Sequence, residues 1–269
     1  MKSIDLKNLL SSVSAEGGVI ELPAGVHEVN EPLVLDVPNV TIKGNGTRLI
    51  VKSSGAQADF LQATPNVSNL NITDISFEWH RAKSSDLIQT AGADIRLTNC
   101  DFRVKSSDDL KKWGAFFHQV GGESRKLQRG IWVSNCRFEL GPYVIGVHLA
   151  KVRSVYFSGN LFNGGLSGPC RGIWCQGENY LQITGNSFTD FSYRNLPDPV
   201  EAVFIDNPWG DLGHLEITGN HFHTIFGENS CAIRLKRHVY GTISGNVFGR
   251  VQGQGNAAIE LEEAGSTNI

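Results

Sequence analysis

The chain has 269 residues, a formal net charge of −3 at pH 7 and 40% hydrophobic residues. This length suits one elongated domain, and the small negative charge argues against general nucleic-acid binding. Thirty glycines beside a single methionine are typical of a turn-rich all-β protein. The five cysteines are an odd number without a CxxC pair, which favours reduced thiols over a disulfide framework.

The first residues carry no apolar signal region, and no later run approaches membrane-spanning length. We therefore expect no membrane partner, and a protein that is cytoplasmic, phage-borne, or secreted with its signal removed. Residues 3–13 place apolar side chains at helical spacing, which predicts a short amphipathic helix. Within a cap of residues 1–16, this helix would cover the open edge of the first strand layer.

An eight-residue motif recurs along the chain, most clearly as LQITGNSF at residues 181–188. Its copies end in a phenylalanine, which falls at positions 77, 102, 138, 162, 188, 222 and 248. A period in the mid-twenties, with alternating apolar residues inside each unit, predicts strands stacked in a solenoid. We predict one single-stranded parallel β-helix of about eight to nine turns over residues 17–262, right-handed like other parallel crossovers, with a tail at 263–269.

Stacking makes the residues of one repeat position neighbours in space. An amide ladder is expected from Asn160, Asn186, Asn220 and Asn246. The phenylalanines that follow each of these residues by two positions are expected to stack in the core. Both columns are structural, and neither points to a function.

The segments GGVIELPAGVHEV (17–29), PLVL (32–35) and NVTIKGNG (39–46) resemble the first turn of the pectate-lyase-like superfamily of right-handed parallel β-helices. That superfamily includes pectate lyases, polygalacturonases, alginate epimerases and phage tailspikes. The resemblance covers nearly the whole chain for fold, and it implies a polysaccharide or oligosaccharide as the partner.

The catalytic motifs of these families are largely missing from this chain. Ser107-Asp108-Asp109 and Arg234-Leu235-Lys236 echo two polygalacturonase segments, but the chain has no NTD and no GHG segment. Asp198-Pro199-Val200-Glu201 only faintly resembles the DPHD segment of alginate epimerases. The resemblance therefore leaves the reaction open.

A second strand precedes each late copy of the motif, and its alternate residues are expected to face outward. One outward column contains His148, Trp174, Phe204, Arg234 and Glu260. The other contains Ala150, Gln176, Asp206, Lys236 and Glu262. For the last two turns, cross-strand ion pairs are the simpler interpretation. The three large rings of the first column favour a ligand platform, or coverage by a loop or a neighbouring subunit.

Two stretches, residues 103–130 and 189–214, exceed the basic repeat by about ten residues each. Extra residues in a solenoid form loops, and loops on one side often build a binding face. With about three turns between them, we expect a cleft on the order of 14 Å wide with His148 and Trp174 on its floor.

Several residues of this region are candidates for chemistry. Hydrolysis of a glycosidic bond needs two carboxylates, and the candidates are Glu201 and Asp206 from the second stretch and Asp108 and Asp109 from the first. Elimination or epimerisation at a uronate needs a base, His148 or Lys236, and a cation, Arg171 or Arg234. The predicted substrate-binding residues are Trp174, Phe204, Arg171, Gln176, Asp108 and Asp109.

We predict a carbohydrate-active enzyme that cleaves or remodels a polysaccharide containing uronic acid. The alternative is a non-catalytic phage-tail or surface carbohydrate-binding module, and a small-molecule enzyme on the same fold is a third hypothesis. His221 and His223 form an exposed pair without a third ligand, so no metal and no cofactor are predicted, although Ca²⁺ is left open. A homo-oligomer is left open as well.

Overall fold

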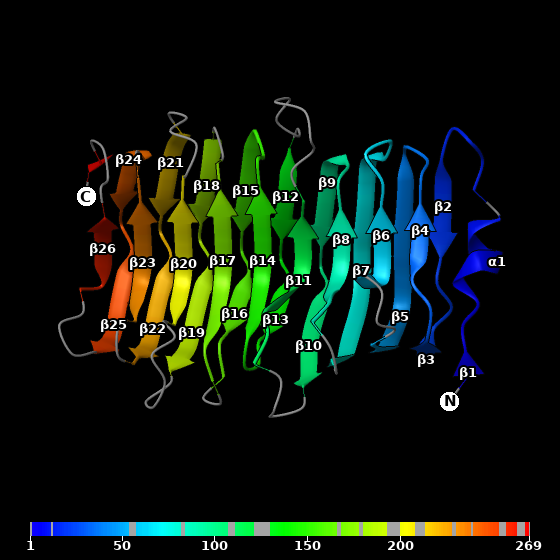
Figure 1. Cartoon of the computed structure of the whole chain (residues 1–269), viewed down its shortest axis with the longest axis horizontal. Helices are drawn as coiled ribbons and strands as arrows, with labels where there is room; N and C mark the ends of the chain where they lie inside the picture. Colours follow the sequence, from blue (N-terminus) through cyan, green and yellow to red (C-terminus); the bar gives the residue numbers. More distant parts are fainter. Residues whose placement is uncertain are drawn as a thin grey trace.

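Short strands joined by turns coil into a parallel β-solenoid of about eight turns with almost no helix (Figure 1). The computed structural model describes residues 2–11, 13–53, 58–81, 84–106, 111–120, 130–165, 168–177, 180–192, 200–207, 213–227, 230–237, 239–252, 257–262 and 267–268. The predicted parallel β-helix is therefore confirmed as an all-β parallel solenoid.

The described strands form two sheets that run the length of the solenoid. The smaller one, nearest the viewer in Figure 1 and called the front sheet below, contains β4 (Leu33–Leu35), β6 (Ala58–Ala63), β8 (Asp86–Thr90), β11 (Gly114–Gln119), β14 (Val144–Ala150), β17 (Cys170–Gln176), β20 (Glu201–Asp206), β23 (Cys231–Lys236) and β26 (Ile259–Glu262). Each of these strands pairs in parallel with its equivalents in the adjacent turns.

The larger sheet forms the remaining walls. It contains β1 (Lys2–Ser3), β2 (Gly18–Glu21), β3 (Gly25–Val29), β5 (Val40–Lys52), β7 (Ser68–Arg81), β9 (Ala93–Thr98), β10 (Asp101–Ser106), β12 (Ile131–Ser134), β13 (Arg137–Glu139), β15 (Ser154–Ser158), β16 (Leu161–Asn163), β18 (Tyr180–Thr184), β19 (Ser187–Ser192), β21 (Gly213–Thr218), β22 (His221–Phe226), β24 (Val239–Ser244), β25 (Val247–Gln252) and β27 (Thr267–Asn268). The last of these pairs with β24, so the predicted tail contributes a short strand.

The repeated motif turns a corner of the solenoid at its Gly-Asn step. Gly185 has a φ of 64°, and Asn135 occupies the equivalent position with a φ of 53°. Only glycine, asparagine and aspartate adopt this left-handed conformation readily, which explains why the motif places Gly or Asn there. The bend brings the next residue, Asn186, into the interior.

The two predicted interior columns are confirmed. The Asn160 Nδ2 donates to the Asn186 Oδ1 at 2.9 Å, and the Asn186 Nδ2 donates to the Asn220 Oδ1 at 3.0 Å. Beside this ladder the phenylalanine rings lie parallel, with Phe162 and Phe188 at 4.9 Å between centroids. The ring stack also extends back through Phe138 and Phe102. These columns fix the turns in register.

The N-terminal helix is shorter than residues 3–13. Helix α1 spans Leu6–Leu10, and Asp5 caps it by accepting the Asn8 backbone N–H at 3.1 Å. The residues before Asp5 are extended instead, because Lys2–Ser3 pairs with β3. Figure 1 places α1 at the end of the solenoid, beside β2, and Leu6 packs into the core with 5% exposure. The helix therefore lies over the first turn, as predicted.

Substitution Asn186→Ala should lower the free energy of unfolding by about 2–4 kcal/mol, because it removes the shared acceptor of the buried Asn160 backbone N–H and of one of the two bonds that the Asn160 amide donates. Denaturant unfolding followed by far-UV circular dichroism would measure the loss. The matched control is Asn66→Ala, because the exposed Asn66 amide donates to the Asp36 carboxylate at the surface, where water replaces the lost bond and the loss should be smaller. Equal losses at both positions would contradict the ladder's contribution.

Candidate functional site

The outward columns of the front sheet have the predicted register. His148 pairs with Trp174, Trp174 with Phe204, and Phe204 with Arg234. One turn earlier, His118 pairs with His148, so the column is longer than the sequence indicated. We call His118, His148, Trp174, Phe204, Arg234 and Glu260 the front column. The second predicted column, from Ala150 to Glu262, is also in register.

The rings of the front column stack face to face. The His118 and His148 centroids are 4.3 Å apart with planes 15° from parallel, and His148 and Trp174 are 4.2 Å apart at 12°. Trp174 and Phe204 follow at 5.9 Å. Both faces of His148 and Trp174 are thus covered by neighbouring rings, so a ligand on this sheet meets their edges. The column therefore differs from an open platform on which a sugar ring lies flat.

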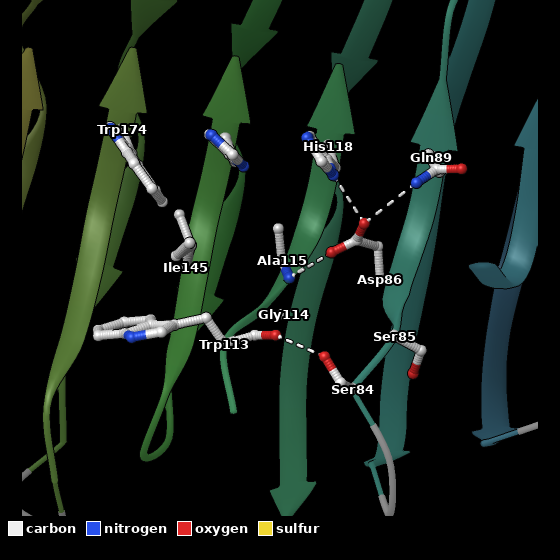
Figure 2. A pocket seen from close by; sticks show the side chains of 11 residues that line it. Ser84, Ser85, Asp86, Gln89, Trp113, Gly114, Ala115, His118, Ile145 and Trp174 are labelled. Carbon is white, nitrogen blue, oxygen red and sulfur yellow. Dashed lines mark hydrogen bonds and ion pairs between the residues drawn. The ribbon is translucent and has the colours of Figure 1, made fainter. Parts of the chain in front are cut away.

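A cavity of about 380 Å³ opens beside the histidine end of the front column (Figure 2). Gly114 and Ala115 form part of its floor, and a Cβ on Gly114 would meet the backbone O of Ser85 and the Arg81 guanidinium, so only glycine fits there. Both the predicted residues His148 and Trp174 line this cavity. The full lining is Ser84, Ser85, Asp86, Gln89, Trp113, Gly114, Ala115, His118, Ile145, His148 and Trp174.

Asp86 at the start of β8 organises one side of the cavity. Its Oδ1 accepts the Ala115 backbone N–H at 2.8 Å, and its Oδ2 lies 2.7 Å from the His118 Nδ1 (Figure 2). The Gln89 amide donates to the same Oδ2 at 3.4 Å. Because a carboxylate accepts hydrogen bonds, it holds the proton of His118 on Nδ1 and fixes the orientation of the ring.

His148 is a neutral imidazole at neutral pH. Its pKa is lowered to about 4, mainly by burial and in addition by the neighbouring His118. Its Nε2 lies 3.2 Å from the Gln176 Oε1. Since that oxygen accepts, Nε2 carries the proton and Nδ1 has the free lone pair. His148 therefore has the protonation state of a general base.

Glu201 lies between two guanidinium groups under the front column. Its Oε2 is 2.5 Å from the Arg171 Nε and its Oε1 is 3.0 Å from the Arg234 Nε, and the residue is 1% exposed. The Arg171 guanidinium also lies 4.6 Å from the centroid of the Trp174 ring and 5.0 Å from that of Trp113. This carboxylate holds an internal ion pair and does not line the cavity.

The remaining predicted site residues lie farther along the front sheet. Asp206 accepts two bonds from Arg237, at 2.9 Å from Nε and 2.7 Å between Nη2 and Oδ2. Lys236 pairs with Glu262 at 3.1 Å, and Arg234 pairs with Glu260 at 2.9 Å. These are the cross-strand ion pairs of the simpler interpretation. A catalytic role for Glu201, Asp206, Arg234 or Lys236 stays a prediction, because none of them lines the cavity.

Parts of both long stretches lie outside the described residues, including Asp108 and Asp109 and the ranges 107–110, 121–129, 193–199 and 208–212. The predicted cleft walls therefore cannot be placed. The first stretch does contribute Trp113 to the cavity, held by hydrogen bonds from Ser84 to its carbonyl at 3.2 Å.

Sequence reasoning missed Asp86, Trp113 and His118. The signal for His118 was present, because one more step of the repeat before Val147 leads to Phe117 and so places His118 beside His148. The long stretch after residue 103 concealed that step. Nothing in the repeat distinguishes Asp86 or Trp113 from ordinary turn residues.

The described part of the chain contains no cluster of three His, Cys, Asp or Glu side chains that could hold a metal ion. The rings of His221 and His223 lie 5.9 Å apart. None of the described helices is long and apolar enough to span a membrane.

Neither protein-family models nor curated proteins yield a match to this chain. The architecture itself is compatible with the parallel β-helix superfamilies. The function must therefore be argued from the cavity.

The stability of the fold should depend on the ionisation of His148. Because its folded pKa of about 4 lies below the ordinary 6.5, the unfolded chain binds the proton more readily, and stability present above pH 6.5 falls as the pH drops toward 4. The loss from this residue should reach about 3 kcal/mol. Denaturant titrations of the wild type and His148→Phe at pH 7 and pH 4 would isolate it, since the variant should lack this component.

Substitution Glu201→Gln should lower the free energy of unfolding by about 3–5 kcal/mol, because it leaves two guanidinium groups without their buried counter-charge. The control is Glu262→Gln, whose carboxylate is 32% exposed and pairs at the surface, so that its loss should cost at most about 1 kcal/mol. Chemical denaturation measures both. Similar stabilities for the two variants would refute the structural assignment of Glu201.

Proposed function

We propose that this chain is a carbohydrate-active enzyme that acts in the front-sheet cavity with His148 as its general base. The observation that carries the proposal is the neutral His148 beside the Asp86–His118 pair at the cavity. A perturbed histidine in a cavity with convergent polar groups is the usual mark of an active site.

The lining favours a hydroxyl-bearing ligand. A cavity of about 380 Å³ lies within the range of small-molecule sites. It combines polar groups of Ser84, Asp86 and Gln89 with the aromatic side chains of Trp113 and Trp174. Sugars present hydroxyl groups and apolar ring faces together, so they suit such a mixed lining. The resemblance of residues 17–46 to the pectate-lyase-like superfamily supports a polysaccharide as the source of the sugar.

In this proposal the His148 Nδ1 accepts a proton during the reaction. Gln176 stabilises the resulting imidazolium. Its Oε1 accepts a hydrogen bond from the His148 Nε2–H, and this bond becomes stronger when the ring is charged. Asp86 holds His118 in the adjacent layer and so keeps the stack in place. Hydrolysis by a pair of carboxylates has weaker support, because Asp86 is the single carboxylate among the described residues of the lining.

The alternative is a non-catalytic carbohydrate-binding solenoid of the phage-tail or surface type. The observation that favours it is the face-to-face stacking of the front column, since stacked rings and cross-strand ion pairs stabilise a solenoid without any chemistry. Both hypotheses place the sugar in the same cavity, and they differ in whether it is transformed.

The test is incubation with a panel of acidic and neutral polysaccharides, followed by absorbance near 235 nm for new double bonds and by release of reducing ends. The His148→Phe variant keeps a ring in the stack and removes the base, so turnover should fall by about 10²-fold or more. The matched control is His214→Phe, because His214 also stacks on a ring, 5.5 Å from Tyr180, on the other sheet. That variant should keep full activity.

The pH profile gives an independent check. If His148 acts as the base, kcat/KM should rise with pH through about 4 and stay level toward neutrality. Full activity of His148→Phe would remove the base from the proposal. Absence of turnover on the whole panel, with binding retained, would establish the non-catalytic alternative.

A further inference from the structure

We infer that the sugar unit held in the front-sheet cavity is uncharged, with hydroxyl groups and no carboxylate. This inference rests on the proposed function, in that it assumes a carbohydrate ligand. It departs from the expectation of a uronate and follows from the charges and hydrogen-bonding groups around the cavity.

The described lining carries negative charge without a cationic side chain of its own. Asp86 lines the cavity directly, and no Lys or Arg is among the described residues of the lining. A second carboxylate, Asp59, lies behind it, fully buried, and accepts the Ser85 hydroxyl at 2.6 Å and the Trp79 indole N–H at 2.8 Å. An anionic ligand would have to approach both groups.

One guanidinium lies close to the cavity floor; both of its terminal nitrogens are engaged, whereas its Nε has no hydrogen-bond partner. Arg81 is 1% exposed, and it donates to the Tyr143 carbonyl at 3.1 Å and to the Lys112 carbonyl. Gly114 lies between it and the cavity, with the Arg81 Nε 2.9 Å from the position a Cβ would take. Against this guanidinium stand the carboxylates of Asp59 and Asp86, so the described charged groups at the floor do not add up to a net positive charge.

The next cation along the sheet is Arg171, and its side chain already contacts other groups of the protein. Its side chain is 13% exposed, its Nε contacts the Glu201 carboxylate at 2.5 Å, and the rings of Trp113, Trp174 and Phe204 lie within 5.0 Å of its guanidinium carbon. A buried carboxylate neutralises its charge. It therefore offers no free partner for the carboxylate of a uronate.

The hydrogen-bonding groups lead to the same conclusion. Among the hydrogen-bonding groups of the lining, the Asp86 carboxylate, the His148 Nδ1 and the Ser84 hydroxyl oxygen accept, whereas the Trp174 Nε1–H is a buried donor without a partner. A sugar hydroxyl can both donate and accept and so suits this mixture, whereas a carboxylate can only accept. A carboxylate placed beside Asp86 would add like-charge repulsion that the partly closed cavity screens poorly.

This substrate class also bears on the reaction. Elimination and epimerisation at a uronate begin with removal of a proton from the carbon next to the carboxylate, and an uncharged sugar has no such acidic proton. New absorbance near 235 nm is therefore not an expected signal of turnover.

Binding to matched pairs of oligosaccharides tests the inference without requiring turnover. The two members of each pair have equal length and linkage and differ only in carrying CH₂OH or carboxylate at C6, as carboxyl reduction of an oligouronate provides. Isothermal titration calorimetry should show that the neutral member of the best-bound pair binds about tenfold or more tightly. In Asp86→Asn this ratio should shrink toward one, because the repelling charge is removed.

The control variant is Glu216→Gln, which removes one negative charge from the other sheet, where Glu216 accepts from Gln182 at 3.1 Å. Its binding ratio should equal that of the wild type. Should Asp86→Asn not fold, the salt dependence of the wild type serves instead: raising the salt from 0.02 to 0.5 M should strengthen binding of the anionic member and leave the neutral one unchanged.

Each outcome decides a different statement. Equal or tighter binding of the anionic member would overturn the inference and leave the proposed function standing. A ratio that persists unchanged in a folded Asp86→Asn variant would show that the cavity charge is not its cause, and would also overturn it. Absence of binding for every pair would overturn the proposed function itself.

Discussion

The in-register stacking of parallel strands governs everything else in this structure. Each turn places its residues roughly 4.8 Å above those of the previous turn, so equivalent side chains must tolerate each other as nearest neighbours. Carboxamides do so by donating to the next oxygen, as Asn160 does to Asn186, and aromatic rings do so by lying parallel, as Phe162 does on Phe188. A column is therefore stable only when its members are mutually compatible, which makes the column, and not the single turn, the unit of stability.

The same rule limits where charge can be placed on the surface. Like charges directly opposite one another are destabilising, and the charged positions of the front sheet alternate accordingly. Arg171 is followed by Glu201, and Arg234 is followed by Glu260. Glu201 is buried because the guanidinium groups of Arg171 and Arg234 cover it from both sides. The carboxylate that looked most suited to catalysis in the sequence is thus explained by the electrostatics of stacking.

The repeat predicted those features that repeat, and failed where the chain departs from it. The solenoid, the asparagine ladder and the outward column from His148 onward follow from position within the motif alone. The burial of Glu201 does not, because it depends on coverage by other side chains: Glu201 is in register with the outward-facing Arg171, and the guanidinium groups of Arg171 and Arg234 cover it. The cavity was also hidden, because part of its floor consists of the small residues Gly114 and Ala115, which carry no sequence signal for a site.

The cavity shows how a regular scaffold can acquire chemistry from an interruption of its pattern. A complete column of rings buries its faces and is inert, but at His118 and His148 the rings carry nitrogen atoms at their edges, and both residues line the cavity. Burial in the stack is also what keeps His148 unprotonated, since the low dielectric disfavours the imidazolium. The interaction that stabilises the solenoid and the neutrality of His148 thus have the same origin. A substitution that loosens the stack should lower stability and raise the pKa of His148 toward its ordinary value, whereas one that keeps the ring and removes its nitrogens affects the chemistry alone.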